Sequence, residues 1–445
     1  MTKTPPNQLP KTSSPGQKIN IITLGCSKNL VDSEVLMRQL DGKYLVQHDS
    51  NEKSDVLVIN TCGFIGDAKE ESIDMILQAV EAKKNGELKK IFVTGCLSER
   101  YKKDLQEEIE AVDGFFGVNE LPEVLAALDV DLKKELLGER HISTPKHFAY
   151  LKISEGCDRN CSFCAIPLIR GKHKSKPKEE IIREVEFLIS KGVKELILIA
   201  QDLTYYGIDI YGRKELPDLV SQIAKVPGVE WVRLHYAYPV QFPEELLKVM
   251  RDNPKVCNYL DIPLQHISER ILRSMKRGLG EKATVDLIEK IKKEVPDAAL
   301  RTTLIVGYPG ETEEEFQQLY SFVEKYKFDR LGVFKYAHEE GTSAYFLEDD
   351  VSEEVKQDRL DRLMMLQQQI SFELNKQKEG RLLKTIIDRK EGDYYIGRSE
   401  YDSPEVDNEV LISVKDESLT IGEFYTVRIN KTDFFDLYGE IAQNE

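Results

Sequence analysis

The sequence predicts an α/β protein that contains an N-terminal parallel α/β domain, a partial (βα)6 barrel of the TIM type and a small C-terminal antiparallel β-barrel. Three observations predict this fold class: a strand–cysteine–helix pattern that occurs three times, six further strand–helix units, and a final run of short alternating strands. A chain of 445 residues exceeds the usual size of one hydrophobic core, so several domains are expected. We place the three domains at 18–133, 147–378 and 380–445, after a flexible leader at 1–17.

The first domain repeats one pattern, in which an apolar strand ends at a cysteine and a helical stretch follows. The strands are KINIITLGC, DVLVINTC and KKIFVTGC, which end at Cys26, Cys62 and Cys96. Strands that alternate with helical stretches such as residues 71–84 imply right-handed βαβ crossovers and a parallel sheet. Because the carboxyl ends of parallel strands share one edge of the sheet, we expect the three cysteines to gather there.

The second domain follows a polar linker at 134–147, which Pro145 interrupts. Helix-like segments such as 177–192 alternate with apolar strands, and six such units are typical of an open TIM-type barrel. The strands are expected at 148–153, 194–200, 229–235, 258–264, 299–307 and 330–336. In this fold the chemistry takes place at the carboxyl ends of the strands. A long helix at 353–380 leads to the short strands of the third domain.

Composition narrows the class of protein. Hydrophobic residues make up 41% and charged residues 31%, and no apolar run approaches the roughly 20 residues that a bilayer requires. No apolar stretch precedes Ile19, so we expect no signal peptide and a cytoplasmic protein with no membrane partner. A net charge of −16 disfavours general binding to phosphate backbones and suits a basic protein partner better.

The seven cysteines indicate metal or catalytic chemistry, because an odd number in a chain without an export signal argues against a disulfide framework. Cys157, Cys161 and Cys164 form a C-x3-C-x2-C loop after the first barrel strand. Three thiolates on a short loop can hold three irons of a four-iron cluster and leave one iron open to a ligand. The alternative is a zinc knuckle with His173 as fourth ligand, although a solvated or substrate-facing role suits this histidine better.

Four polar side chains are candidates for contacts to a cofactor or substrate. Gln201 and Asp202 follow the second barrel strand and occupy its rim. Arg233 and Arg301 lie within strands and could bind a carboxylate, or could serve as internal ion-pair partners. Cys257 stands alone inside a strand pattern, where a structural role is expected.

The cysteine loop resembles the signature of the radical S-adenosylmethionine (SAM) superfamily, whose open iron chelates SAM before reductive cleavage to a deoxyadenosyl radical. Phe163, between the last two cysteines, matches the aromatic residue found there in the superfamily, and it could also shield the cluster by packing. The segment LIVGYPGET resembles the superfamily's cofactor-binding segment. Its Gly307 and Gly310 would let the backbone approach SAM closely, although such glycines also make ordinary turns.

Taken together, the domain order resembles the methylthiotransferase family, since the third domain is similar to the TRAM module. This resemblance covers nearly the whole chain. The family attaches a methylthio group to a transfer-RNA adenosine or to a ribosomal-protein aspartate. The residues that distinguish the two branches resemble the branch that modifies small-subunit ribosomal protein twelve; they are Ser27-Lys28-Asn29, Asp158-Arg159-Asn160, DIPLQH (261–266) and TDFFDLYGE (432–440).

This resemblance implies a transferase with two [4Fe-4S] clusters. Cys157, Cys161 and Cys164 would hold the cluster that cleaves SAM, and the radical would remove hydrogen from the β-carbon of the target aspartate. The other three family cysteines, at the ends of the first domain's strands, would hold a second cluster that handles the methylthio group. The electron donor is not identified by the sequence.

Two rival functions stay open at this point. A transfer-RNA methylthiotransferase is less suited to the chain, because residues 381–445 contain 8 Lys or Arg against 15 Asp or Glu. A non-catalytic iron–sulfur sensor or carrier would hold clusters without releasing deoxyadenosine.

Overall fold

The computed structural model describes residues 16–414 and 418–442, so the predicted leader at 1–17 lies largely outside the described residues. The chain divides into two compact units, Met1–His141 and Ile142–Glu445. This division falls inside the stretch 134–147 that the sequence predicted as a linker. Within the described residues, no helix combines the length and apolar character needed to cross a bilayer.

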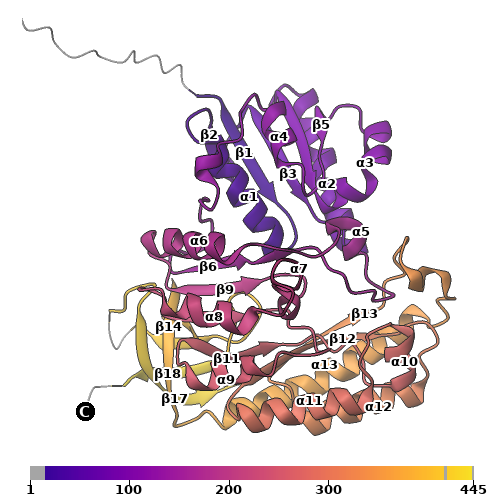
Figure 1. Ribbon diagram of the computed structural model, residues 1–445, viewed down its shortest axis with the longest axis vertical. Helices are drawn as coiled ribbons and strands as arrows, with labels where there is room; N and C mark the ends of the chain where they lie inside the picture. The colour runs from indigo at the N-terminus through magenta and orange to yellow at the C-terminus, as the bar shows by residue number, and fades with distance from the viewer. Residues whose placement is uncertain (1–15, 415–417, 443–445) are drawn as a thin grey trace, which may run out of the picture. The chain divides into compact units, whose positions relative to one another are not determined.

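The first unit is a three-layer α/β structure around a five-stranded parallel sheet (Figure 1). Its strands, in the spatial order β2-β1-β3-β4-β5, are β1 (Lys18–Thr23), β2 (Leu45–His48), β3 (Val56–Thr61), β4 (Lys90–Gly95) and β5 (Gly114–Phe115). The three predicted strands are the adjacent β1, β3 and β4. Two strands were not predicted from the sequence: β2, which is short and mostly half-exposed, and β5, which has two residues.

Helices cover both faces of this sheet. Apolar side chains of α1 (Ser27–Leu40) and α4 (Leu121–Ala127) pack on one face, against residues such as Ile21 and Val58. Those of α2 (Gly66–Lys84) and α3 (Cys96–Glu108) pack on the other. Both faces are therefore closed, and the carboxyl edge of the sheet is left for chemistry.

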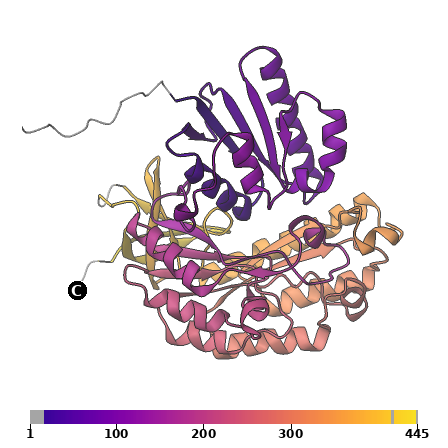
Figure 2. The ribbon, with the colours of Figure 1, turned by 45° about the horizontal axis from the view of Figure 1, so that its top comes forward.

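The second unit is built on six parallel strands in the order β13-β12-β11-β10-β9-β6, which confirms the predicted partial barrel. The strands are β6 (Phe148–Lys152), β9 (Glu195–Ile199), β10 (Trp231–Leu234), β11 (Val256–Asp261), β12 (Ala299–Val306) and β13 (Arg330–Lys335). The main helices are α6 (Lys178–Ser190), α8 (Leu216–Lys225), α9 (Glu245–Asp252), α11 (Glu281–Glu294), α12 (Glu313–Tyr326) and α13 (Glu353–Lys376). Figure 2 shows helices lying along one face of this sheet.

Shorter strands, helices and 3-10 turns lie within the loops of the chain. They are the strands β7 (Ser154–Glu155) and β8 (Lys174–Ser175), the helices α5 (Ile166–Arg170), α7 (Ile208–Tyr211) and α10 (Glu269–Ser274), and the 3-10 turns η1 (Lys134–Leu136), η2 (Leu203–Tyr205) and η3 (Ser343–Phe346). Most of them lie in loops at the carboxyl ends of the barrel strands, where the fold class places its chemistry.

Side chains alternate between the two faces of the six-stranded sheet, as the strand period requires. Leu196 and Leu300 belong to the large core beneath the helices. Trp231, Cys257 and Tyr259 instead belong to the core of the C-terminal barrel. The C-terminal barrel therefore packs against the inner face of the sheet, and the isolated Cys257 is a buried core residue.

The C-terminal barrel is closed, and its strands follow the order β14-β15-β16-β18-β17. They are β14 (Leu382–Glu391), β15 (Tyr394–Ser399), β16 (Val410–Ser413), β17 (Phe424–Thr432) and β18 (Leu437–Ile441). One detail of the predicted antiparallel barrel is wrong, because β16 and β18 pair in parallel. A closed ring of five strands cannot reverse direction at every pairing, so one parallel pair is required.

Candidate iron–sulfur sites

The loop of Cys157, Cys161 and Cys164 follows β6 and β7 at the carboxyl side of the barrel. Gly156 has φ +72°, and a side chain there would collide with the backbone at Lys172. The Cys157 N–H donates to the carbonyl of Gly171 at 3.0 Å. Since the first cysteine can take its place only if the preceding residue is glycine, the sequence Gly-Cys sets the local geometry.

The thiols of this loop lie in a partly desolvated setting. Burial raises the pKa of Cys157 to about 11 and that of Cys164 to about 12. The neighbouring Cys161 sulfur contributes to both of these rises in pKa. Such thiols become thiolates when a metal binds, because the metal replaces the proton.

Two arginines and a tyrosine surround Cys161, and no sequence pattern singled them out as a group. The Arg277 Nη1 donates to the Cys161 Sγ at 3.3 Å. The Tyr238 ring lies between the guanidinium groups of Arg277 and Arg159, which are 4.2 Å and 4.3 Å from its centroid. The loop therefore carries positive charge beside its middle cysteine.

The rim residues predicted from the sequence join this loop. Asp202 accepts from the Arg159 Nε at 2.9 Å, and Gln201 donates to Glu155 at 2.6 Å. Burial alone would raise the pKa of Glu155, but Lys152 and Arg170 hold it at about 2. The Oε1 of Gln201 is buried and has no hydrogen-bond partner among the described residues. Gln201 therefore offers an acceptor to a ligand at this rim.

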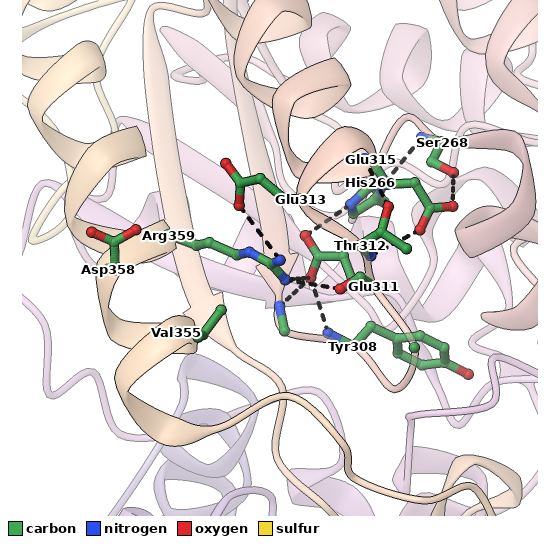
Figure 3. Close-up of polar contacts among 12 residues, drawn as sticks. His266, Ser268, Tyr308, Glu311, Thr312, Glu313, Glu315, Val355, Asp358 and Arg359 are labelled. Atoms are coloured by element: carbon green, nitrogen blue, oxygen red, sulfur yellow. Dashed lines mark hydrogen bonds and ion pairs between the residues drawn. The ribbon is translucent and has the colours of Figure 1, made fainter.

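The segment with Gly307 and Gly310 is held by the buried carboxylate of Glu311, whose contacts with Tyr308, His266 and Arg359 are drawn in Figure 3. Glu311 accepts the backbone N–H groups of Gly307 and Tyr308, the latter at 3.2 Å. It also contacts His266 and Arg359, each at 3.4 Å. Both glycines have positive φ, +72° and +76°. Glu311 was missed as a site residue, although it directly follows Gly310.

The glycine segment and the cysteine loop are connected to each other. The Tyr308 hydroxyl lies 2.8 Å from that of Ser162. Phe163 packs on the small core that contains Tyr308 and Met275. The two segments that resemble cofactor-binding motifs therefore form one assembly at the carboxyl ends of the strands.

Arg233 and Arg301 are bound by other groups. The Arg233 Nε pairs with Glu195 at 2.7 Å, and its Nη1 donates to the Glu400 carbonyl at 2.7 Å. Arg301 pairs with Asp407 at 2.6 Å. These contacts correspond to the internal ion-pair alternative. His173, the candidate zinc ligand, has its Nε2 3.0 Å from the Ser175 hydroxyl.

In the first unit, Cys26, Cys62 and Cys96 directly follow the neighbouring strands β1, β3 and β4, apart from a two-residue turn before Cys26. A side chain at Gly25 would lie 2.7 Å from the Cys62 Cβ, and one at Gly63 would lie 2.7 Å from the Leu97 backbone. Glycines thus allow the three cysteine-bearing loops to approach one another closely.

Asn29 connects these loops. Its Nδ2 donates to the carbonyls of Leu24 and Thr61, at 2.9 Å and 3.0 Å, and its Oδ1 lies 3.6 Å from the Cys96 Sγ. The structure therefore brings the three cysteines to one edge of the sheet. No local pattern in the sequence marks this bridging position of Asn29, which was predicted only as a residue that distinguishes two branches of a family.

Both cysteine sets have the donor chemistry for iron–sulfur clusters. No group of three or more His, Cys, Asp or Glu side chains within residues 16–414 and 418–442 is arranged around a single metal ion. Each thiolate of a four-iron cluster binds a different iron, so its ligands do not converge on one point.

Comparison with known proteins matches three segments of the chain to family models. Residues 151–323 match the Radical SAM superfamily, residues 380–442 match the TRAM domain, and residues 18–117 match a group described as uncharacterized protein family UPF0004. A protein of Phocaeicola vulgatus named ribosomal protein uS12 methylthiotransferase RimO is 60% identical over 95% of this chain and 99% of its own. A protein of the same name from Christiangramia forsetii is 58% identical over 95% and 94%.

The chain belongs to the ribosomal protein uS12 methylthiotransferase family. It is accordingly a transferase of the radical SAM class, as the motifs predicted. Among solved structures, the radical SAM methyltransferase TsrM from Kitasatospora setae is similar, with a TM-score of 0.55 and 12% identity over 83% of this chain and 80% of TsrM. The cobalamin-dependent SAM radical enzyme OxsB has a TM-score of 0.51 and 12% identity over 79% of this chain and 56% of OxsB. At this identity, the two structures support the fold alone.

Proposed function

We propose that this chain replaces a hydrogen on the β-carbon of an aspartate in ribosomal protein uS12, the small-subunit protein twelve, with a methylthio group. The observation that carries the proposal is the identity of 58–60% over almost the full length of relatives named ribosomal protein uS12 methylthiotransferase. The choice of an aspartate β-carbon is what the family resemblance implies. The cytoplasm remains the predicted location.

Each of the two cysteine sets would hold one [4Fe-4S] cluster. Cys157, Cys161 and Cys164 would hold the cluster beside SAM, and Cys26, Cys62 and Cys96 would hold the second. When bound, these groups supply a deoxyadenosyl radical for hydrogen removal and a methylthio group for transfer. The protein's own contribution is to orient the reactants and to exclude water from them.

The rim and glycine residues would bind SAM. Gly307 and Gly310 present backbone at a strand end, and Glu311 fixes this backbone through two N–H groups. The Gln201 Oε1 and the polar rim at Asp202 would accept hydrogen bonds from SAM or substrate. Phe163 would pack over the cluster side of the loop.

An exposed strip near the cysteine loop suits a protein substrate. The Ala344 N–H donates to the Ser162 carbonyl at 2.7 Å, which ties η3 to the loop. Directly after Ala344, the side chains of Tyr345, Phe346 and Leu347 are 41%, 85% and 40% exposed. Glu348, Asp349 and Asp350 follow and are also exposed. Asp349 pairs with Lys356 at 2.9 Å, so Glu348 and Asp350 carry the acidic charge beside these apolar groups. Apolar groups next to acidic ones complement a segment that is both basic and apolar.

The acidic composition of residues 381–445 favours a basic protein substrate over transfer RNA. The structure weakens this argument, because part of the acidic charge is compensated inside the protein. The side chains of Asp402 and Asp407 are buried, and they pair with Arg330 and Arg301 of the six-stranded sheet. Their negative charge is therefore compensated inside the protein and is not exposed to a partner. An excess of acidic side chains remains, which disfavours a phosphate backbone at this module.

The test is a reaction of the cluster-loaded protein with uS12, SAM and a chemical reductant, followed by intact-mass measurement. The expected result is a gain of one methylthio group by uS12 and release of deoxyadenosine. A Cys164→Ala variant serves as the control and should give neither product. The proposal fails if uS12 keeps its mass while transfer RNA, supplied in a parallel reaction, gains the group.

A further inference from the structure

Arg277 is a buried cation placed directly beside the cysteine loop. It lies three residues after the end of α10, and only 5% of it is exposed. Its Nη1 donates to the Cys161 Sγ at 3.3 Å, and its Nη2 donates to the Pro263 carbonyl. Its Nε is buried and has no hydrogen-bond partner among the described residues. The guanidinium group is therefore held on one side by neutral groups and on the other by a sulfur.

The surroundings of Arg277 differ from those of other buried arginines. Other buried arginines of the same unit each pair with an acid: Arg233 with Glu195, Arg330 with Asp402, and Arg398 with Asp388. Within residues 16–414 and 418–442, no Asp or Glu lies within ion-pair distance of Arg277. A buried charge without a counter-charge is strongly unfavourable, so a negative group belongs beside it.

The Cys161 sulfur is the atom that can carry this negative charge. The Tyr238 hydroxyl, 3.6 Å from the same sulfur, donates to the Arg277 carbonyl at 2.7 Å and is not available as a donor to the sulfur. Cys157 receives a neutral donor, the Arg159 backbone N–H at 3.4 Å. Of these three contacts to the sulfurs of the loop, the one from Arg277 is the contact made by a charged donor.

We propose that Arg277 is a positioning residue that tunes the cluster on Cys157, Cys161 and Cys164, and that its cation and N–H group favour the reduced form. This inference rests on the proposed function, which assigns a [4Fe-4S] cluster to that loop. Reduction adds one electron, taken from an external one-electron reductant, and hence one negative charge. Net charge and hydrogen bonds to the sulfurs set the reduction potential of such clusters, so a cation at Cys161 raises it.

The experiment is a redox titration, followed by electron paramagnetic resonance in the absence of SAM. Cys26, Cys62 and Cys96 are all replaced by alanine, so that only the cluster of interest contributes to the signal. On this parent, Arg277→Gln removes the charge, and Arg277→Lys keeps the charge but loses the planar fork. Arg273→Gln is the matched control, because it removes the same charge from α10 at a side chain that is 79% exposed.

The expected result for Arg277→Gln is at least a tenfold shift of the reduction equilibrium toward the oxidised cluster, which is about 59 mV for a one-electron couple. Arg277→Lys should shift it less, and Arg273→Gln should not shift it, because solvent screens an exposed charge. An unchanged potential in Arg277→Gln overturns the proposal. A loss of SAM affinity with an unchanged potential overturns it also, because Arg277 would then bind SAM.

If Arg277→Gln does not retain iron, its potential cannot be measured, and the thermal unfolding temperatures of the cluster-free variant and parent are compared instead. The proposal expects this cluster-free variant to unfold at the parent's temperature or above, since an unpaired buried charge is gone, while iron retention falls. A cluster-free variant that melts well below the parent indicates a purely structural role and overturns the proposal. If the parent itself shows no four-iron signal, the proposed function fails, which is a separate result.

Discussion

Asp407 is expected to hold the C-terminal barrel against the inner face of the six-stranded sheet. Its side chain is fully buried. It accepts from the Arg301 Nη1 at 2.6 Å, the Tyr259 hydroxyl at 2.8 Å and the Ser403 N–H at 2.9 Å. Replacement of Asp407 by alanine would leave one cation and two neutral donors without their acceptor.

The magnitude follows from what each donor loses. Breaking a buried ion pair by removing one partner costs about 3–5 kcal/mol. The Arg301 side chain is 22% exposed and its Nε lies 3.9 Å from Asp261, so part of its charge stays compensated. The Tyr259 hydroxyl is buried and donates to Asp407, so it would lose this acceptor. We therefore expect Asp407→Ala to lower the free energy of unfolding by about 3 kcal/mol.

Urea denaturation of the cluster-free protein, followed by circular dichroism, measures this loss. The variant should lower the urea midpoint for unfolding of residues 142–445 and leave the midpoint for residues 1–141 unchanged. Glu423→Ala is the matched control, because Glu423 also joins the C-terminal barrel to the core, through Lys194 at 2.6 Å, but is 53% exposed. That exposed pair should contribute less than about 1 kcal/mol. Equal losses in the two variants would refute the reasoning.

Three further changes have expected outcomes. Cys26→Ala should halve the bound iron in an iron and sulfide assay, because each cysteine set holds its own cluster; full iron would contradict the second cluster. Gly307→Ala should weaken SAM binding in equilibrium dialysis, since φ is +72° and the Lys356 side chain fills the space, whereas Gly392→Ala, which faces open space, should not. Burial opposes ionisation of Glu315, but Arg270 holds its pKa at about 2. We therefore expect Glu315→Gln to lower the free energy of unfolding by about 2 kcal/mol at neutral pH. That difference should shrink as pH falls from about 4.5 toward 2, where the unfolded carboxyl is protonated first; a difference that stays constant to pH 3 would be evidence against it.

Local pattern was sufficient to predict the three cysteine-bearing strands of the first domain and the six strands of the second, although it missed the short β2 and β5. Continuous apolar runs such as 56–61 and 195–199 can only be buried strands or helices, and the cysteine or polar residue after each marks the carboxyl edge. The six-stranded sheet followed from counting such runs, and the small C-terminal barrel from the short alternating strands after residue 380. The parallel pairing of β16 with β18 did not, since it depends on closure of the ring and not on either strand.

The rest of the site could not be predicted from the sequence, because it depends on contacts between residues that are far apart in the chain. Arg277 and Cys161 are 116 residues apart, and Arg301 and Asp407 are 106 apart. Nothing local distinguishes an arginine that contacts a thiol from one that pairs with an acid. Arg233 and Arg301 were therefore plausible cofactor ligands from the sequence, and their engagement by the C-terminal barrel became visible only in the fold.

The most direct test of the central claim follows one hydrogen atom. Ribosomal protein uS12 is prepared with deuterium on the β-carbon of its aspartates and is incubated with the cluster-loaded chain, SAM and a reductant. The account predicts that deoxyadenosine gains one deuterium and that the modified aspartate loses one as it receives the methylthio group. Deoxyadenosine without deuterium, formed while uS12 is modified, would contradict it.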